Sequence, residues 1–188
     1  FAARWGWTPN VVTMLSGAAG LVAFLLGLFL SASEPLSSVF LIYVAAQLSY
    51  IFDCADGQLA RATGTASKFG DFFDKSVDMV AFTLVFGGFF GFLYRHKVAI
   101  DDTTGGEIWL VLGFLFLMTR TARFASWQRI QIEVGEDYPE NTDGSGLVVT
   151  ISKNLMDMQA SLFGMLLFPF APNLCFLIFA SQAVIMGA

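Results

Sequence analysis

The chain carries two acidic segments, DCADGQLAR at residues 53–61 and GDFFDKSVD at residues 70–78, separated by eight residues. Strongly apolar sequence borders them on both sides. Ionisable groups at membrane depth are costly, and where they occur they usually serve a function. Several carboxylates crowded together also repel one another unless cations lie between them. The two segments therefore predict a divalent-metal site at one face of a membrane.

The composition is that of a polytopic helical membrane protein. Of the 188 residues, 56% are hydrophobic and only 13% are charged, and the mean hydropathy is +0.67. A soluble domain carries about 25% charged residues, so the deficit and the long uncharged runs indicate membrane spans. There is no basic run that would predict nucleic-acid binding. Cys54 and Cys175 offer neither a disulfide framework nor a metal-ligand spacing.

We expect an all-α transmembrane bundle of about six spans, forming a single domain over residues 1–188. The first span is Val11 to Leu30, twenty residues without a charge. Thr8-Pro9-Asn10 before it is typical of a helix start, with Thr8 as the cap. Further spans are expected at 36–52 (helical to 61), 70–94, from about 108, from about 148 and from 173, with polar connections at 31–35, 62–67, 95–106 and 131–146. Because the chain begins with Phe and stops inside an apolar run, both ends are expected to be trimmed.

Lysines and arginines predict the orientation of the spans, because they concentrate on the cytoplasmic side. With the amino terminus inside, eight lie on that side and two on the other. The first set is Arg4, Arg61, Lys68, Lys75, Arg120, Arg123, Arg129 and Lys153, and the second is Arg95 and Lys97. The acidic segments, at the ends of spans two and three, are then expected to face the cytoplasm.

The acidic residues fall on one face of each predicted helix, since positions i, i+3, i+4, i+7 and i+8 share a face. The second span presents Asp53, Asp56, Gly57, Ala60 and Arg61, and the third presents Ser67, Gly70, Asp71, Asp74 and Asp78. The short connection makes the two helices antiparallel neighbours. The two polar faces can therefore meet.

These faces combine the side chains that metal-assisted phosphoryl transfer requires. Carboxylate oxygens suit hard cations such as Mg²⁺ or Mn²⁺, and two ions about 3.5–4 Å apart match a two-metal arrangement. Gly57 allows a ligand to approach the backbone closely, Ala60 keeps the face shallow, and Arg61 can fork onto a phosphate.

Other polar residues near the site have less defined predicted roles. Asp71 is interpreted either as functional or as a solvated residue. Lys75 is expected to be a charge partner of neighbouring acids. His96, placed in a predicted loop between Arg95 and Lys97, is expected to be incidental.

At these residues the chain closely resembles the CDP-alcohol phosphotransferase (CDP-alcohol phosphatidyltransferase) family of integral membrane enzymes. The family signature is an Asp pair, Gly, Ala-Arg, an eight-residue gap, Gly and two Asp at four-residue spacing. It is matched at Asp53, Asp56, Gly57, Ala60, Arg61, Gly70, Asp74 and Asp78. Thr8-Pro9-Asn10 is also similar to a common feature of the family, and the expected span number agrees with it.

The resemblance implies a reaction of phospholipid biosynthesis in which a CDP-linked donor loses CMP as an alcohol attacks its β-phosphorus. It implies that Asp53, Asp56 and Asp74 bind two Mg²⁺ or Mn²⁺ ions, and that Asp78 contacts one ion and acts as general base. It also implies that Gly57, Arg61 and Ser67 hold the CDP moiety, with the small side chain of Ala60 at the bottom of the binding site. Membrane lipid is an expected partner, and a homodimer is left open.

The acceptor and the direction of lipid transfer stay open. Arg120 and Arg123, at i and i+3, are either ligands of an acceptor phosphate or ordinary positive-inside flanking residues. Inositol phosphate, glycerol phosphate, serine, ethanolamine and choline are all compatible acceptors, and the lipid can be on the donor or the acceptor.

Two other classes of protein compete with this interpretation. A membrane prenyltransferase also holds Mg²⁺ and a diphosphate on Asp-rich faces, but its acidic motifs are expected far apart in sequence. A divalent-cation transporter would need acids near the bilayer midplane and polar positions continuing to the far side.

Overall fold

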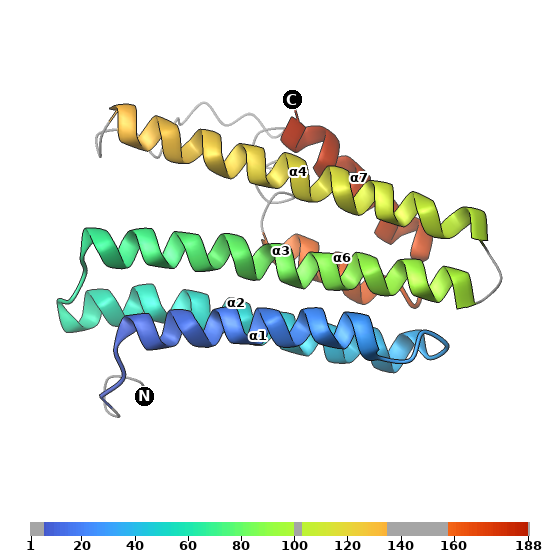
Figure 1. Ribbon diagram of the computed structural model, residues 1–188, viewed down its shortest axis with the longest axis horizontal. Coiled ribbons are helices and arrows are strands. Elements are labelled where there is room, and N and C mark those ends of the chain that lie inside the picture. Colours follow the sequence, from blue (N-terminus) through green and yellow to red (C-terminus); the bar gives the residue numbers. More distant parts are fainter. Residues whose placement is uncertain (1–5, 100–102, 135–157, 188) are drawn as a thin grey trace. The chain divides into compact units, whose positions relative to one another are not determined.

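A computed structural model describes residues 6–99, 103–134 and 158–187, and these ranges consist of helices and short turns, without strands (Figure 1). The helices are α1 (Pro9–Phe29), α2 (Pro35–Thr63), α3 (Lys68–Ala99), α4 (Thr103–Val134), α6 (Met158–Leu167) and α7 (Pro172–Gly187). Four of them, α1 to α4, are long and apolar enough to cross a membrane. The predicted all-α membrane architecture is confirmed. The chain forms two compact units, Phe1–Leu110 and Val111–Ala188, and the single-domain assignment stays a prediction.

In the first unit, α1 packs along both α2 and α3, which contact each other less (Figure 1). Small residues bring the backbones of α1 and α3 together. A Cβ atom added to Gly20 would lie 3.0 Å from the Ala81 Cα, and one added to Gly88 would lie 2.6 Å from the Phe24 Cα. Transmembrane helices that cannot rely on a hydrophobic driving force associate through such small-residue contacts. The α1–α3 contact therefore depends on glycine.

Buried serines join α1 to α2. The Ser49 hydroxyl donates to the Ser16 carbonyl at 2.9 Å, and the two hydroxyl oxygens lie 3.4 Å apart. Both residues are about 1% exposed. Hydrogen bonds between transmembrane helices contribute roughly 0.6 to 2 kcal/mol each, so this pair helps to hold α1 in register with α2.

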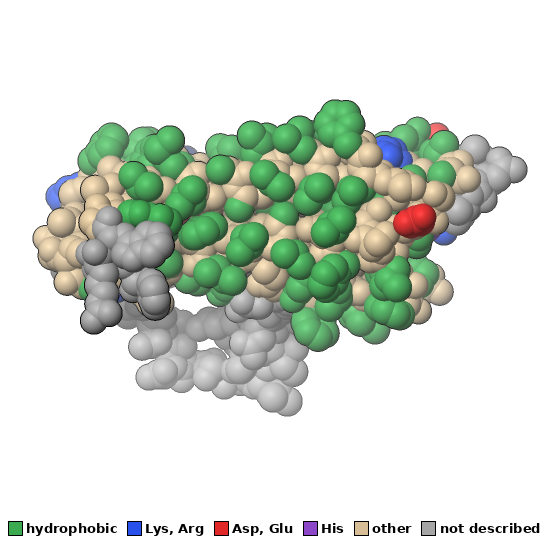
Figure 2. Space-filling view, turned by 90° about the horizontal axis from the view of Figure 1, so that it is seen from below, with side chains coloured by type: hydrophobic (Ala, Val, Ile, Leu, Met, Phe, Trp, Pro, Cys, Tyr) green, Lys and Arg blue, Asp and Glu red, His purple; other side chains and the backbone are tan. Residues whose placement is uncertain are grey.

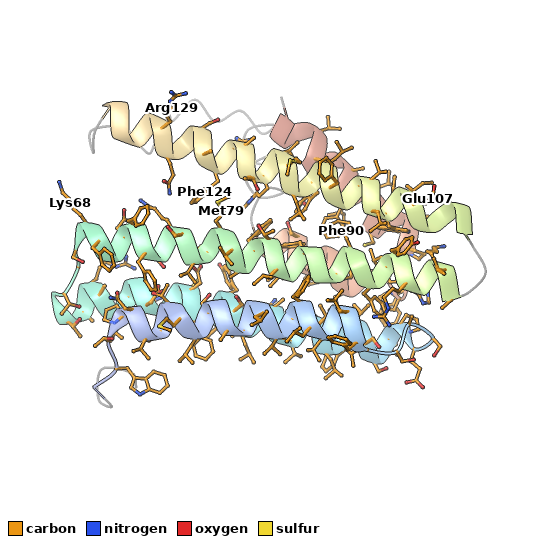
Figure 3. The ribbon with its side chains drawn as sticks, in the orientation of Figure 1. Lys68, Met79, Phe90, Glu107, Phe124 and Arg129 are labelled. Carbon is orange, nitrogen blue, oxygen red and sulfur yellow. The ribbon has the colours of Figure 1, made fainter. Side chains whose placement is uncertain are left out.

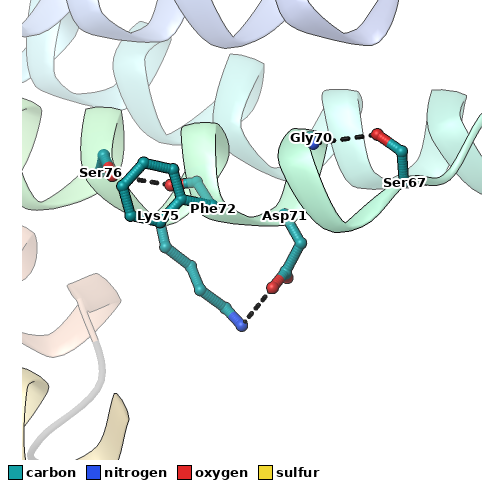
Figure 4. Close-up of polar contacts among 6 residues, drawn as sticks. All are labelled: Ser67, Gly70, Asp71, Phe72, Lys75 and Ser76. Atoms are coloured by element: carbon teal, nitrogen blue, oxygen red, sulfur yellow. Dashed lines mark hydrogen bonds and ion pairs between the residues drawn. The ribbon is translucent and has the colours of Figure 1, made fainter. Parts of the chain in front are cut away.

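The link between α2 and α3 is short, as predicted. Gly64 ends α2 with φ of 65°, in the left-handed region that favours glycine. Ser67 caps α3, because its hydroxyl accepts the Gly70 N–H at 3.0 Å (Figure 4). Thr8 occupies the cap position of α1, but its side chain makes no capping hydrogen bond. The antiparallel course of α2 and α3 follows from the four residues at 64–67.

The predicted polar loop at 95–106 is wrong in extent, since α3 continues to Ala99 and α4 begins at Thr103. The reason is that Arg95 and His96 lie in α3 and hydrogen-bond to backbone carbonyls at and just after the end of α1. The Arg95 guanidinium donates to three carbonyls at the end of α1, those of Gly27, Leu28 and Leu30. The His96 Nδ1 is hydrogen-bonded to the Ala32 carbonyl at 2.5 Å. The Arg95 bonds satisfy carbonyls that the end of α1 leaves without partners. His96 lies in α3 and not in a loop, and its lack of a functional role stays a prediction.

The outer surface of the first unit is apolar, as a membrane span requires. Exposed apolar side chains follow α1 and α2, among them Met14, Leu21, Phe29, Phe40 and Ile51. Figure 2 shows a face covered largely by hydrophobic side chains with few charges. Lys68 projects from the first turn of α3, whereas Met79 and Phe90 lie along the apolar remainder of that helix (Figure 3). The charged residues of α3 therefore lie in its first eleven residues and near its end, at Arg95 and Lys97.

In the second unit, α6 and α7 pack closely. A Cβ added to Gly164 would meet Ile178 at 3.3 Å, and the buried Ser161 hydroxyl donates to the Gln182 Oε1 at 3.1 Å. The expected break between the last two helices is confirmed, because α6 ends at Leu167 and α7 begins at Pro172. The expected start of the fifth helix, at about 148, lies outside the described residues.

Two adjacent glycines test the α1–α3 contact. Gly88→Ala should lower the thermal unfolding midpoint in detergent, because its Cβ would collide with the α1 backbone and overpacking costs about 1–3 kcal/mol. Gly87→Ala is the matched control, since a Cβ there meets nothing within 4 Å, and it should leave the midpoint unchanged or raise it. Equal midpoints for the two variants would contradict the proposed packing.

Candidate active site

The polar faces of α2 and α3 meet, and three carboxylates gather between them. One oxygen each from Asp53, Asp74 and Asp78 lies within 4.8 Å of the other two, and all three residues are partly buried. Asp53 comes from α2, and the other two lie one helical turn apart on α3. Like charges at this spacing repel one another strongly where the dielectric constant is low. The cluster is therefore unstable as three bare anions.

Two oxygen atoms of this cluster indicate what would stabilise it. The Asp74 Oδ1 and the Asp78 Oδ1 are buried without a hydrogen-bond partner. An unpartnered buried carboxylate oxygen is expensive, whereas a divalent cation bound by carboxylate oxygens satisfies it. The residues present therefore fit a metal ion, and hard oxygen-preferring ions such as Mg²⁺ or Mn²⁺ match the donor set.

Asp56, the fourth predicted ligand, lies beside this cluster and is held by α1. It is 3% exposed, and its carboxylate is within electrostatic reach of Asp74. Its Oδ2 accepts the Thr13 hydroxyl at 2.5 Å, and its Oδ1 accepts the Gly57 N–H at 2.5 Å. The structure thus brings all four predicted aspartates to one place, with Asp53, Asp74 and Asp78 as the tighter group.

An open cavity of about 180 Å³ adjoins the aspartates. The residues predicted to contact a nucleotide, Gly57, Ala60, Arg61 and Ser67, line it together with Asp56, Gly70, Asp71, Asp74, Thr65, Ala66 and three residues of α1, which are Pro9, Asn10 and Thr13. Carboxylates and a guanidinium that line one cavity can together bind a metal–diphosphate group.

Arg61 and Gly57 form one wall of the cavity. A Cβ added to Gly57 would lie 3.5 Å from the Arg61 Nη1, so the guanidinium lies along the bare backbone of Gly57. A Cβ atom at this position would be in van der Waals contact with the guanidinium. The Ser67 hydroxyl, although it accepts the Gly70 N–H, keeps its own proton available for an acceptor in the cavity.

Asp71 and Lys75 form an ion pair at the rim. The Lys75 Nζ lies 2.7 Å from the Asp71 Oδ2 (Figure 4). The Lys75 prediction, a charge partner of a neighbouring acid, is confirmed. Asp71 both lines the cavity and is 62% exposed, so the geometry leaves its two interpretations open.

The sequence prediction omitted the residues that α1 contributes. Thr13 is 2% exposed and contacts a predicted ligand, and Asn10 lines the cavity. A faint signal was present, because Pro9, Asn10 and Thr13 share one helical face and Thr13 is polar within an apolar span.

The predicted acceptor ligands Arg120 and Arg123 belong to the second unit, on α4. Arg123 is exposed and Arg120 is partly buried, and their role stays a prediction. Arg129 also projects from α4 (Figure 3). Lys153 and residues 135–146 of the predicted polar connection lie outside the described residues.

Curated proteins align with part of this chain. A phosphatidylinositol phosphate synthase of Streptomyces avermitilis is 36% identical over 89 residues, which are 47% of this chain and 34% of the relative. An archaetidylinositol phosphate synthase of Pyrococcus horikoshii is 35% identical over 104 residues, 55% of this chain and 52% of the relative. A CDP-diacylglycerol–serine O-phosphatidyltransferase of Methanocaldococcus jannaschii is 45% identical over 73 residues, which are 39% of this chain and 29% of the relative. The chain thus spans from under a third to about half the length of these relatives.

A solved structure has the same fold. The crystal structure of Mycobacterium tuberculosis phosphatidylinositol phosphate synthase with CDP-DAG bound superposes with a TM-score of 0.66 at 21% identity, covering 98% of this chain and 83% of that one. The family model for CDP-alcohol phosphatidyltransferases matches residues 6–186. The resemblance seen in the two acidic segments is therefore confirmed, and the chain belongs to the CDP-alcohol phosphatidyltransferase family.

Proposed function

We propose that this protein transfers a substituted phosphate group from a CDP-linked donor to an alcohol acceptor and releases CMP, with divalent metal ions held by Asp53, Asp56, Asp74 and Asp78. The observation that carries the proposal is that Asp74, whose Oδ1 is buried without a hydrogen-bond partner, lines the same cavity as Arg61, Gly57 and Ser67. We propose that these aspartates bind two ions, either Mg²⁺ or Mn²⁺.

The lipid is proposed to arrive on the donor, as CDP-diacylglycerol. Two observations on relatives support this choice. The Methanocaldococcus jannaschii relative is named for CDP-diacylglycerol as substrate, and the structural neighbour was solved with CDP-DAG bound. Inositol phosphate and serine are the first acceptors to test, because the relatives' names point to those headgroups.

In the proposed reaction each residue has a separate task. Bound metal ions would neutralise the diphosphate and the charge that develops on the leaving CMP. Arg61 donates two parallel hydrogen bonds to a phosphate, and Gly57 lets the nucleotide approach the backbone. Asp78 accepts the proton of the acceptor hydroxyl while the hydroxyl oxygen attacks the β-phosphorus. No covalent intermediate is needed, because the hydroxyl displaces CMP directly.

The site is proposed to face the cytoplasm, on the basis of the eight-to-two distribution of basic residues. The acids also gather at one end of α2 and α3. A cation pathway would instead require polar side chains continuing along the spans, yet α3 beyond the site buries Ala81, Val85, Phe86 and Phe89. Release of CMP in vitro, together with absent cation flux in liposomes, distinguishes the enzyme from a transporter.

Metal removal tests the site as a whole. Chelation with EDTA should abolish CMP release from CDP-diacylglycerol, and added Mg²⁺ or Mn²⁺ should restore it, because the clustered carboxylates require cations to bind a diphosphate. CMP release is followed with a radiolabelled donor and a panel of polar alcohols. Release that continues at the same rate in EDTA would contradict the metal-site proposal.

Asp78→Asn tests the general base. The amide keeps an oxygen for a metal but cannot accept a proton, so kcat should fall about 100-fold or more while the dissociation constant for CDP changes little. Glu34→Gln is the matched control, since Glu34 is an exposed acid at the other end of α2, and it should leave both constants unchanged. Near-normal turnover in Asp78→Asn would remove Asp78 from the role of base.

Arg61→Ala tests the phosphate contact. Loss of charge-assisted hydrogen bonds worth about 1.5–3 kcal/mol should raise the dissociation constant for CDP roughly 10- to 100-fold. Arg61→Lys keeps the charge but loses the fork, so an intermediate affinity is expected. Calorimetry in the presence of Mn²⁺ measures both variants, and unchanged CDP binding in Arg61→Ala would exclude Arg61 from the site.

A further inference from the structure

We infer that Thr13 of α1 is a positioning residue for the metal site, acting through the carboxylate of Asp56. The inference rests on the proposed function only in taking Asp56 as a metal ligand. Thr13 contacts no residue of the Asp53, Asp74 and Asp78 group directly in the bonds described, and its hydroxyl is engaged with Asp56. Thr13 is therefore not itself a catalytic residue.

The contact is buried and well defined. The Thr13 Oγ1 lies 2.5 Å from the Asp56 Oδ2 and 3.1 Å from the Pro9 carbonyl one turn earlier. A hydroxyl has one proton, and a carboxylate is the stronger acceptor, so the proton goes to Asp56. Thr13 is 2% exposed and Asp56 is 3% exposed, so bulk water does not compete for either group. The bond therefore fixes the rotation of the carboxylate.

Asp56 depends on α1 for this orientation. Its other oxygen, Oδ1, accepts the Gly57 N–H, from the adjacent residue of the same helix. Because Gly57 belongs to the same helix as Asp56, its N–H does not fix the carboxylate relative to any other helix. Asp74 of α3 also lies within interaction distance of the Asp56 carboxylate, but two ionised carboxylates repel each other. Thr13 is therefore the neutral donor that relates the Asp56 carboxylate to another helix. Residues that orient metal ligands from outside the ligand set typically change metal affinity 10- to 100-fold when mutated.

The helix that carries Thr13 is itself firmly placed. One turn along, Ser16 is bonded to Ser49 of α2, and Gly20 packs on the α3 backbone. The position of the Thr13 hydroxyl is thus determined by contacts that do not involve the aspartates. The first helix contributes a fixed donor to a site whose carboxylates lie on the second and third helices.

Direct Mn²⁺ binding tests the inference without substrate. Free Mn²⁺ is measured from its EPR signal during titration of purified protein in detergent. Thr13→Val, which replaces the hydroxyl by a methyl group of similar size, should raise the Mn²⁺ dissociation constant roughly 10- to 100-fold. Thr13→Ser restores the hydroxyl and should return the constant to near the wild-type value. If Thr13→Val does not fold, Thr13→Ala makes the same comparison.

Ser16→Ala is the matched control, because it removes another buried α1 hydroxyl that contacts no carboxylate. It keeps the Ser16 backbone carbonyl, which accepts the Ser49 hydroxyl and holds α1 against α2. It should leave Mn²⁺ affinity unchanged. The loss caused by Thr13→Val should also disappear in an Asp56→Asn background, because residues that act through one contact are not additive. Wild-type affinity in folded Thr13→Val, or an equal loss in Ser16→Ala, would overturn the inference. Absence of Mn²⁺ binding in the wild type would instead overturn the proposed function, and the inference with it.

Discussion

Mutual repulsion among the aspartates of α2 and α3 is the constraint on which the rest of this molecule depends. Three carboxylate oxygens lie within 4.8 Å of one another, and the Oδ1 atoms of Asp74 and Asp78 are buried without hydrogen-bond partners. Such an arrangement is costly unless cations complete it. The same requirement makes the site useful, because ions held by carboxylates keep positive charge available for a diphosphate. Stability and function are therefore in conflict here, as is common at active sites.

The first helix resolves part of this conflict by holding the other two. It packs against α3 through glycines and is bonded to α2 through serines. At one end Arg95 satisfies its terminal carbonyls, and at the other end Thr13 and Asn10 reach the site. The rigid contacts of α1 thus let α2 and α3 present like charges to each other without separating.

Much of the fold was predictable from the sequence because its signals are local. The uncharged run after Asn10 predicts a span by length alone, and Gly64 predicts the end of α2 because a left-handed residue follows the helix. Spacing also placed Asp53, Asp56, Asp74 and Asp78 on facing helices. The predicted polar loop at 95–106 was wrong because Arg95 bonds to the end of α1 and His96 bonds to Ala32 in the connection that follows it. These are tertiary contacts that composition cannot reveal.

The part of the site that was not predicted comes from α1, because its contact with the aspartates is also a tertiary contact. Thr13 is one hydroxyl in an apolar span, and only the packing of α1 shows that it meets Asp56. Spacing within α2 and α3 could not supply this, since the contact joins residues that are 43 positions apart. Family membership is established from the whole-chain match, whereas the acceptor depends on residues such as Arg120 and Arg123, whose role no local pattern determines.

The central claim is that cations lie between the facing carboxylates of α2 and α3. Crystals grown with Mn²⁺ and CDP, measured at the manganese absorption edge, test it most directly. We expect anomalous density in contact with Asp53, Asp56, Asp74 and Asp78, and we expect the CDP diphosphate to lie between that density and Arg61. Density elsewhere on the protein, or CDP bound in the cavity with no anomalous signal at the aspartates, would contradict it.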